Sequence, residues 1–516
     1  MATTRSILNV LEDYQRSRLS FADEVAELAS KCQNVELLHA AGVMRFLKPL
    51  LLDCVPQIQQ MAALALGHLA SYNEDLASAV VAQKIHLQLV QSLREQDRYS
   101  KRPAAHVLSA VAKHTPALAQ AVVDSKAVEH LVLCLEEFDP AVKETGASAI
   151  GHIARHNAEL AEVVVNAGAV PLLVVCIQEE ELSLRRATLY ALANIAKHTS
   201  NLAQIVVDSN ALSVIAPLIA QSDARLKRQV YCCLSSVAKH SESLAKRIVA
   251  EHVFPKIFLS LKDKDPQVRR NAAVVVRDVS QHTAELASVV ICGNGAAALV
   301  DNITETRGHE RLPGIMAVGC IAAFDDILAD KIIKVNGIPP LMDALSNEEE
   351  DHIRSASAWS LGQIGKHTSN HALAVAMAGV LPRMISTFLC PLSSEDLRKK
   401  CQRALQAIIN KLAHVPALDA LLQGPKVPDD ITGIVVAQLA KILVNDPEAQ
   451  TMFVTSGGFE KLQKMYANFA GEIKEMVDSI NACYPEELVQ YYSPGFSAAV
   501  LQKIIESDSA SLLPSC

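Results

Sequence analysis

Apolar and polar positions along this chain repeat together with a period of 42 residues. The period is marked by histidines, each followed by a short polar stretch and then Leu-Ala: His114, His156, His198, His240 and His282. Tyr72 and Phe324 occupy the flanking positions of the same series, and His367 continues it after a one-residue insertion. A fixed period of this length indicates stacked supersecondary units, because one unit cannot cover its own hydrophobic face. The pattern therefore predicts one continuous solenoid with a long surface for holding partners.

Within one period, residues 199–240, the spacing of apolar residues predicts three helices. Thr199 is a typical N-cap for a short first helix that ends at Asp208-Ser209-Asn210. Asn210 stands where Gly168 stands one period earlier, and both residue types adopt the left-handed conformation that ends a helix. A second helix follows over 211–220. A third and longer helix is predicted over 225–239.

This order of a short, a medium and a long helix resembles the armadillo repeat, as in LANIAKHTSNLAQIVVDSNALSVIAPLIA. The chain is further similar to the armadillo proteins of the central pair apparatus of motile cilia and flagella. That likeness covers nearly the whole chain and rests on AVKETGASAIGHIARHNAELAEVVVNAGAVPLL, DPQVRRNAAVVVRDVSQHTAELA and CYPEELVQYYSPGF. It implies an all-α fold, a right-handed superhelical armadillo solenoid.

The same resemblance implies a non-enzymatic scaffold that binds tubulin in central-pair microtubules and other central-apparatus proteins, and that motility requires. The expected location is the cytoplasm and its cytoskeleton, in the axoneme of the cilium or flagellum. The alternative is a soluble armadillo adaptor in signalling or transport, because the armadillo fold alone serves many functions.

The period also predicts how the chain is divided. Residues 1–33 form an N-terminal helical cap, and residues 34–367 form eight regular repeats of about 42 residues. Irregular armadillo-like repeats follow over 368–480. Residues 481–516 form an aromatic C-terminal cap or tail.

Composition and charge narrow the class of partner. Half of the residues are hydrophobic, only 4% are aromatic, and the net charge is −8, so nothing global indicates nucleic acid. The first residues carry charges where a secretion signal would be apolar, and no stretch reaches the roughly 18 uncharged apolar residues of a membrane span. The twelve cysteines contain no Cys-x-x-Cys pair and indicate buried thiols in a reducing compartment. We expect neither nucleic acid nor membrane as a partner.

The histidine series allows a metal, a catalytic or a structural interpretation. Stacked helices lie about 8–10 Å apart, so histidines from successive repeats cannot share one ion. Each histidine instead follows the end of a third helix, where the ring can bond carbonyls that lack a partner. The sequence also contains no nucleotide-binding loop and no nucleophile with a base at defined spacing. We therefore expect caps, with no enzyme activity, cofactor or metal.

Third helices line the inner face of an armadillo superhelix, so positions repeated on them are candidate contacts. Armadillo import adaptors hold basic peptides with a tryptophan followed four residues later by an asparagine, repeated along the groove. Only Tyr190/Asn194 and Trp359/Gln363 approximate that pair here. The resemblance to import adaptors therefore fails, although these four residues stay candidates for partner binding.

A column of cations lies one turn before those positions. It consists of Lys101, Lys143, Arg185, Lys227, Arg269, Arg311 and Arg354, and a second column adds Arg102, Arg186, Arg228 and Arg270. A cation near a helix N-terminus is mildly unfavourable, so seven cations in one register favour binding of an acidic protein, such as the acidic tails of tubulin. The alternative is a set of solvated helix starts paired with hinge carboxylates such as Asp223 or Asp265.

The C-terminal segment gathers aromatic residues in a chain that has few: Tyr484, Tyr491, Tyr492 and Phe496. One interpretation is a cap that folds back on the last repeat, as an open solenoid end requires. The other is contact with a neighbouring subunit, where tyrosine is enriched. Because the two ends of the chain differ, contact between them would be head-to-tail, and we expect such self-association.

Overall fold

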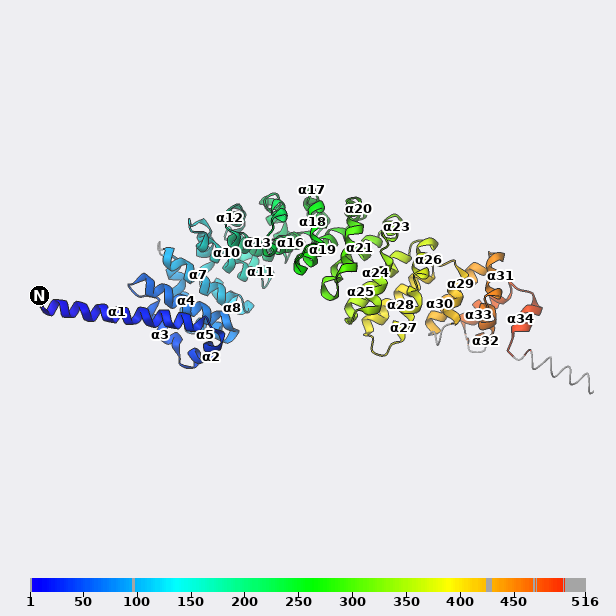
Figure 1. The fold of residues 1–516 in the computed structure, drawn as a ribbon, viewed down its shortest axis with the longest axis horizontal. Coiled ribbons are helices and arrows are strands. Elements are labelled where there is room, and N and C mark those ends of the chain that lie inside the picture. Colours follow the sequence, from blue (N-terminus) through cyan, green and yellow to red (C-terminus); the bar gives the residue numbers. More distant parts are fainter. Residues whose placement is uncertain are drawn as a thin grey trace, which may run out of the picture. The chain divides into compact units, whose positions relative to one another are not determined.

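The computed structural model describes residues 2–94, 98–423, 429–466, 469, 471–494 and 496, and within them every regular element is a helix (Figure 1). The chain divides into two compact units, Met1–Ser260 and Leu261–Cys516. Each unit is a row of three-helix repeats in which a short first helix and a second helix precede a longer third helix.

The first unit begins with the long helix α1 (Ala2–Ala29). Its complete repeats are α2 (Cys32–Ala40), α3 (Val43–Leu50) and α4 (Pro56–Tyr72); α5 (Glu74–Ala82), α6 (Ile85–Arg94) and α7 (Arg98–Ala112); α8 (Pro116–Asp124), α9 (Ala127–Leu133) with η1 (Cys134–Glu136), and α10 (Pro140–Ala154); α11 (Ala158–Asn166), α12 (Ala169–Ile177) and α13 (Leu182–Ala196); α14 (Ser200–Asp208), α15 (Ala211–Ile215) with η2 (Ala216–Ala220), and α16 (Ala224–Ala238). The unit ends with α17 (Glu242–Ala250) and α18 (Phe254–Ser260).

The second unit opens on the third helix α19 (Pro266–Ser280). Its repeats are α20 (Ala284–Cys292), α21 (Gly295–Glu305) with η3 (Gly308–Glu310), and α22 (Leu312–Ala322); α23 (Asp326–Lys334), α24 (Ile338–Asn347) and α25 (Asp351–Gly365); α26 (Ser369–Met377), α27 (Val380–Leu389) and α28 (Glu395–Ile409). The last helices are α29 (Val415–Gln423), α30 (Asp429–Leu443), α31 (Pro447–Thr455), α32 (Gly458–Met465), α33 (Glu472–Asn481) and α34 (Glu486–Tyr492).

The predicted boundaries inside one repeat are confirmed. The side chain of Thr199 accepts a hydrogen bond from the Leu202 backbone N–H at 3.2 Å, which caps α14. Asn210 has φ 62° and Gly168 has φ 83°, both left-handed, where the first helix turns into the second. The third helix α16 starts at Ala224, one residue before the predicted start.

Third helices pack on third helices and carry the core. In the first unit α4 packs on α7, α7 on α10, α10 on α13 and α13 on α16, and α1 takes the place of a preceding third helix against α4. In the second unit α19, α22, α25 and α28 pack in the same order. The buried side chains are mainly Ala, Val, Leu and Ile, which allow this close stacking.

The three-helix unit continues beyond residue 367. Helices α26, α27 and α28 repeat the short, medium and long order, so the change at 367 is one of spacing in the sequence. No single helix in the described ranges is long and apolar enough to cross a membrane, although four bent helix pairs reach that length and composition together.

The predicted capping role of the histidines agrees with their hydrogen bonds, and the structure adds which helix each one caps. Each Nε2 donates to a carbonyl near the end of the third helix of the preceding repeat, at 2.6–2.8 Å: His114 to Ala70, His156 to Ala112, His198 to Ala154, His240 to Ala196 and His367 to Ala322. The ring follows its own third helix in sequence and reaches back to the neighbouring helix. These histidines therefore join successive repeats.

Candidate functional site on the third helices

Large rings on the third helices lie against glycines of the preceding third helix. A Cβ added at Gly67 would lie 2.4 Å from the His106 ring, and one added at Gly151 would lie 2.7 Å from the Tyr190 ring. Gly67 and Gly151 occupy the same register position, three residues beyond the ring position. The missing side chain makes room for the ring in each case. Each of these rings therefore packs against a glycine of the preceding repeat.

In the pair Tyr190/Asn194, the amide of Asn194 makes its hydrogen bonds within its own repeat. Asn194 is buried; its Nδ2 donates to the Tyr190 carbonyl at 2.8 Å, and its Oδ1 accepts from Lys197 Nζ at 2.9 Å. The Tyr190 ring makes an edge contact with His152, with ring centroids 5.5 Å apart. Both polar atoms of the Asn194 side chain are therefore hydrogen-bonded within their own helix and the residues that follow it. In an import adaptor the corresponding amide is free to bind a peptide.

Most cations of the first column are tied to neighbouring hinges. Lys101 Nζ lies 2.5 Å from a carboxylate oxygen of Glu137 in the next repeat, and Lys143 pairs with Glu179 in the same way. Arg269 reaches Glu310 at 2.8 Å. Arg185 donates to the Glu179 carbonyl, and Arg354 pairs with Asp351 at 2.9 Å, while Lys227 is half-buried. These contacts match the hinge-carboxylate alternative and give the column a structural role, whereas its binding role stays a prediction.

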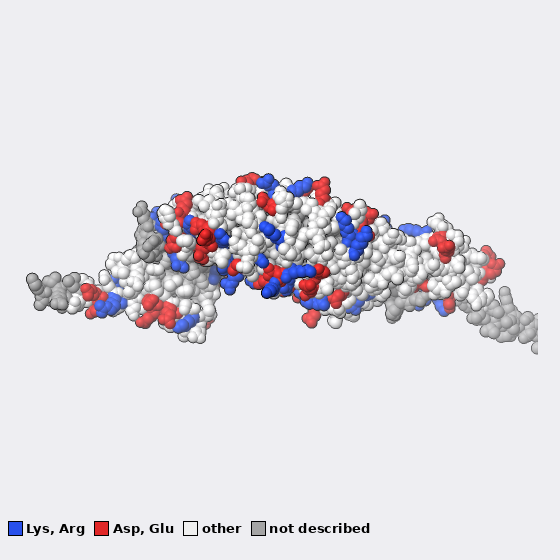
Figure 2. All heavy atoms as spheres, turned by 45° about the horizontal axis from the view of Figure 1, so that its top comes forward, with Lys and Arg blue, Asp and Glu red and all other residues white. Residues whose placement is uncertain are grey.

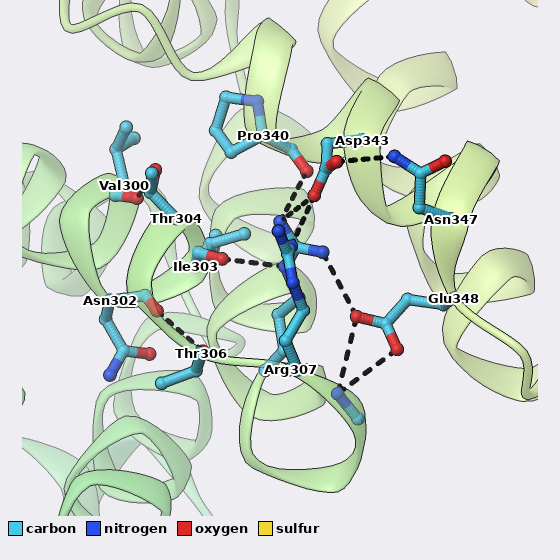
Figure 3. A network of polar contacts seen from close by, with 12 residues as sticks. Val300, Asn302, Ile303, Thr304, Thr306, Arg307, Pro340, Asp343, Asn347 and Glu348 are labelled. Atoms are coloured by element: carbon cyan, nitrogen blue, oxygen red, sulfur yellow. Dashed lines mark hydrogen bonds and ion pairs between the residues drawn. The ribbon is translucent and has the colours of Figure 1, made fainter.

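Arg311 is the most deeply buried member of the column, with 1% of its side chain exposed. Its guanidinium donates to Asp343 at 2.7 Å, to Glu348 at 3.1 Å and to the Ile303 carbonyl at 2.7 Å. Asp343 belongs to α24 and Glu348 to the hinge after it, and Figure 3 shows both carboxylates joined by dashed lines to the network of polar contacts between them. Burial alone raises the pKa of Asp343, but hydrogen bonds from Arg311, Asn347 and Arg307 outweigh it and lower that pKa to about 2.

The second column is exposed only in part. Arg102 is exposed, Arg228 and Arg270 are half-buried, and Arg186 lies 3.7 Å from Asp223. On the face shown in Figure 2, basic and acidic side chains mostly lie next to one another. Because most cations of the first column pair with carboxylates, the two columns do not form a continuous field of free positive charge.

The pair Trp359/Gln363 opens onto a recess of about 250 Å³ between α25 and α28. Its wall includes Trp359, Gln363, Lys400 and Arg403, together with small residues of both helices. Gln363 Oε1 accepts a hydrogen bond from Lys366 Nζ at 2.6 Å. Within the described residues, Lys400 and Arg403 make no ion pair, and Arg403 is exposed. The recess combines one aromatic wall with two available cations.

Comparison with known proteins identifies the family. The model of the Armadillo/beta-catenin-like repeat matches residues 157–197. Sperm-associated antigen 6 of Mus musculus is 63% identical over 500 residues, which cover 97% of this chain and 98% of the relative. The Homo sapiens protein of that name has the same identity and coverage. This chain belongs to the sperm-associated antigen 6 family.

A solved structure agrees on the fold of this sperm-associated antigen 6 family member. The crystal structure of an engineered protein aligns with a TM-score of 0.68 and 22% identity, covering 85% of this chain and 98% of that one. At this identity the likeness concerns the fold alone. Together with the family model, it confirms the predicted all-α armadillo solenoid.

The aromatic segment of this family member lies partly on the last repeat. The rings of Tyr484 and Tyr492 pack on Phe459 of α32, with centroids 4.5 Å and 5.9 Å away, and the Tyr484 hydroxyl donates to the Gln450 carbonyl at 3.2 Å. Tyr491 contacts Phe496 but leaves 61% of its surface exposed. These contacts match a cap on the last repeat that leaves the Tyr491 ring exposed to solvent. Residues 497–516 of the predicted tail lie outside the described residues.

Sequence reasoning did not find Lys400 and Arg403. They lie on α28, beyond the point where the 42-residue period was lost. The signal that could have found them is the register of the third helices: Arg403 occupies on α28 the position that Trp359 occupies on α25. Aligning the helix starts after each hinge, in place of counting residues, exposes this match.

Proposed function

We propose that this chain is a non-enzymatic scaffold of the central apparatus of the ciliary or flagellar axoneme, where it binds central-pair microtubules and neighbouring proteins. Support comes from the resemblance over nearly the whole chain and from relatives whose name, sperm-associated antigen 6, ties them to a flagellated cell. The armadillo solenoid supplies a long surface of stacked repeats that suits such a role.

The recess at Trp359 is the observation that carries the proposed contact. Lys400 and Arg403 have no carboxylate partner in the described part of the chain, so binding an acidic side chain there breaks no internal ion pair. The indole face can cover the aliphatic part of a glutamate while the cations meet its carboxylate. The acidic tails of tubulin have this chemistry.

Much of the first cation column plays a smaller part in this proposal. Lys101, Lys143, Arg269 and Arg311 already pair with carboxylates of the following repeat, so an acidic partner would have to displace those groups. The exposed Arg102 has no such cost and steers acidic partners at longer range. Contact is therefore concentrated at the recess.

Trp359 is the single tryptophan of the chain, so its fluorescence reports on this recess directly. Purified protein is titrated with a glutamate-rich tubulin tail peptide and is co-sedimented with microtubules. We expect a saturable fluorescence change, and weaker peptide and microtubule binding in Lys400→Gln/Arg403→Gln. Both should also weaken with salt, because exposed charges are screened over roughly 10 Å at 0.1 M.

Lys399→Gln is the matched control, because Lys399 neighbours Lys400 on α28 but pairs with Glu395. Microtubules whose acidic tails have been removed by protease give the second control. Unchanged microtubule binding in the double variant would exclude the recess as the contact. Peptide binding without any microtubule binding would favour the soluble adaptor.

A further inference from the structure

We propose that His309, Glu350 and His352 form a binding site for a divalent transition metal, best suited to Zn²⁺, that joins two successive repeats of the second unit. His309 belongs to η3, between the second and third helices of one repeat. Glu350 and His352 lie at the start of α25, the third helix of the next repeat. This site is separate from the recess at Trp359 and does not rest on the proposed function.

The three ligand atoms have the spacing of a metal site. Glu350 Oε2 lies 3.3 Å from His309 Nε2 and 3.3 Å from His352 Nδ1. All three atoms lie within 4.8 Å of one another, and the two rings are 5.1 Å apart with planes 30° from parallel. Ligands bound tetrahedrally at about 2.0–2.1 Å stand about 3.4 Å apart, so a metal fits after a small rotation of the rings.

Hydrogen bonds of Glu348 with Gly308 and Arg311 position the backbone that carries these ligands. The Gly308 backbone N–H, next to His309, donates to Glu348 at 3.1 Å, and Glu348 also accepts from buried Arg311. The Glu350 carbonyl accepts from the Ile353 backbone N–H at 3.0 Å. Figure 3 shows Glu348 reaching from the hinge before α25 toward the loop that carries Arg307. Both ligand-bearing segments are thus fixed to one buried arginine, which lowers the cost of assembling the site.

The local sequence adds a reason why the site occurs at this one hinge. The end of α24 keeps the 42-residue period, because Asn347 lies 42 residues after Glu305 at the end of α21, whereas α25 starts 85 residues after α19, one more than two periods. The inserted residue therefore falls in the stretch that supplies Glu348 and Glu350. The exposed Glu349 between them adds negative charge near the site. No other group of three or more metal-ligating side chains comes together in the described ranges.

The ligand chemistry selects the class of metal. Two imidazoles and one carboxylate suit Zn²⁺ and its transition-metal neighbours, whereas Ca²⁺ and Mg²⁺ require oxygen ligands. Three protein ligands leave a fourth position open to water or to a side chain from a partner. A metal here would tie η3 to α25 across the boundary between repeats.

The test measures Zn²⁺ binding to the full chain by calorimetry at pH 7.5 with a phosphine reductant. We expect one saturable site per chain, no comparable response to Mg²⁺ or Ca²⁺, and a higher Tm with Zn²⁺ present. His309→Asn/His352→Asn and Glu350→Gln should each abolish or strongly weaken both effects. The three side chains are 66%, 48% and 43% exposed, so these substitutions leave the core intact, which circular dichroism verifies.

The control is His252→Asn, an exposed histidine in the left-handed conformation that asparagine also favours; it should bind Zn²⁺ like the wild type. Co²⁺ provides a second readout, since ligation by thiolates gives intense near-ultraviolet absorption that a nitrogen and oxygen site lacks. Absence of saturable Zn²⁺ binding overturns the proposal. So does full Zn²⁺ affinity in the double histidine variant, which would place the metal on cysteines elsewhere.

Discussion

Trp359 lies on the bare backbone of Gly319 in the preceding third helix, where an added Cβ would stand 2.3 Å from its Cζ3 atom. We expect Gly319→Ala to push the indole away and to destabilise the fold by about 1–3 kcal/mol, the usual cost of overpacking. Urea unfolding measures the loss, and a shifted tryptophan emission in the native state reports the displaced ring. Gly168→Asn is the control, because asparagine already stands at the equivalent left-handed position Asn210.

The buried Arg311 network and the half-buried pair of Lys101 with Glu137 should differ in energetic weight. Arg311→Gln leaves Asp343 and Glu348 without their counter-charge, and we expect a loss of about 3–5 kcal/mol. Lys101→Gln removes one more accessible pair and should cost about 1 kcal/mol. Chemical denaturation of both variants checks the ranking. Equal losses of unfolding free energy in the two variants would contradict the view that burial determines how much these ion pairs stabilise the fold.

Acid should weaken the first unit through His152. Burial, with the nearby charges of Arg155 and Lys113, lowers the pKa of His152 to about 4, below the ordinary value of 6.5. Between these values the unfolded chain binds more protons than the native chain, so this group's contribution is full above pH 6.5 and is lost as the pH falls toward 4.

We therefore expect the free energy of unfolding to drop over that window by about 1–3 kcal/mol more in the wild type than in His152→Gln. Urea titrations at several pH values measure it. His39→Gln, at an exposed position, should follow the wild-type curve. Parallel curves for His152→Gln and the wild type would rule out this assignment.

The two faces of the aromatic C-terminal segment should separate stability from assembly. Tyr484→Ala removes packing on Phe459 and the bond to the Gln450 carbonyl, so it should destabilise the last repeat. Tyr491→Ala removes an exposed ring and should reduce head-to-tail self-association while leaving the Tm nearly unchanged. Analytical ultracentrifugation and thermal melts distinguish them. A wild-type chain that stays monomeric at high concentration would contradict the predicted self-association.

The repeat pattern was readable from the sequence because it depends on local rules. Caps such as Thr199 and left-handed residues such as Asn210 act within a few positions, and the structure places them as predicted. The role of the cation column was harder to predict, because Lys101 meets Glu137 only after two repeats stack. Likewise, His309 and His352 are 43 positions apart and come together through a one-residue shift in one hinge. Such contacts depend on the docking of repeats, which a single repeat does not encode.

The histidine that closes the preceding helix has a consequence for how the chain comes apart. When the repeat that contains His198 unfolds, the Ala154 carbonyl loses its hydrogen-bond donor. The third helix of the preceding repeat then has a frayed C-terminal end. Local opening at one repeat therefore lowers the barrier for its N-terminal neighbour. Unfolding should therefore spread toward the N-terminus more readily than toward the C-terminus, although the repeats have similar structures.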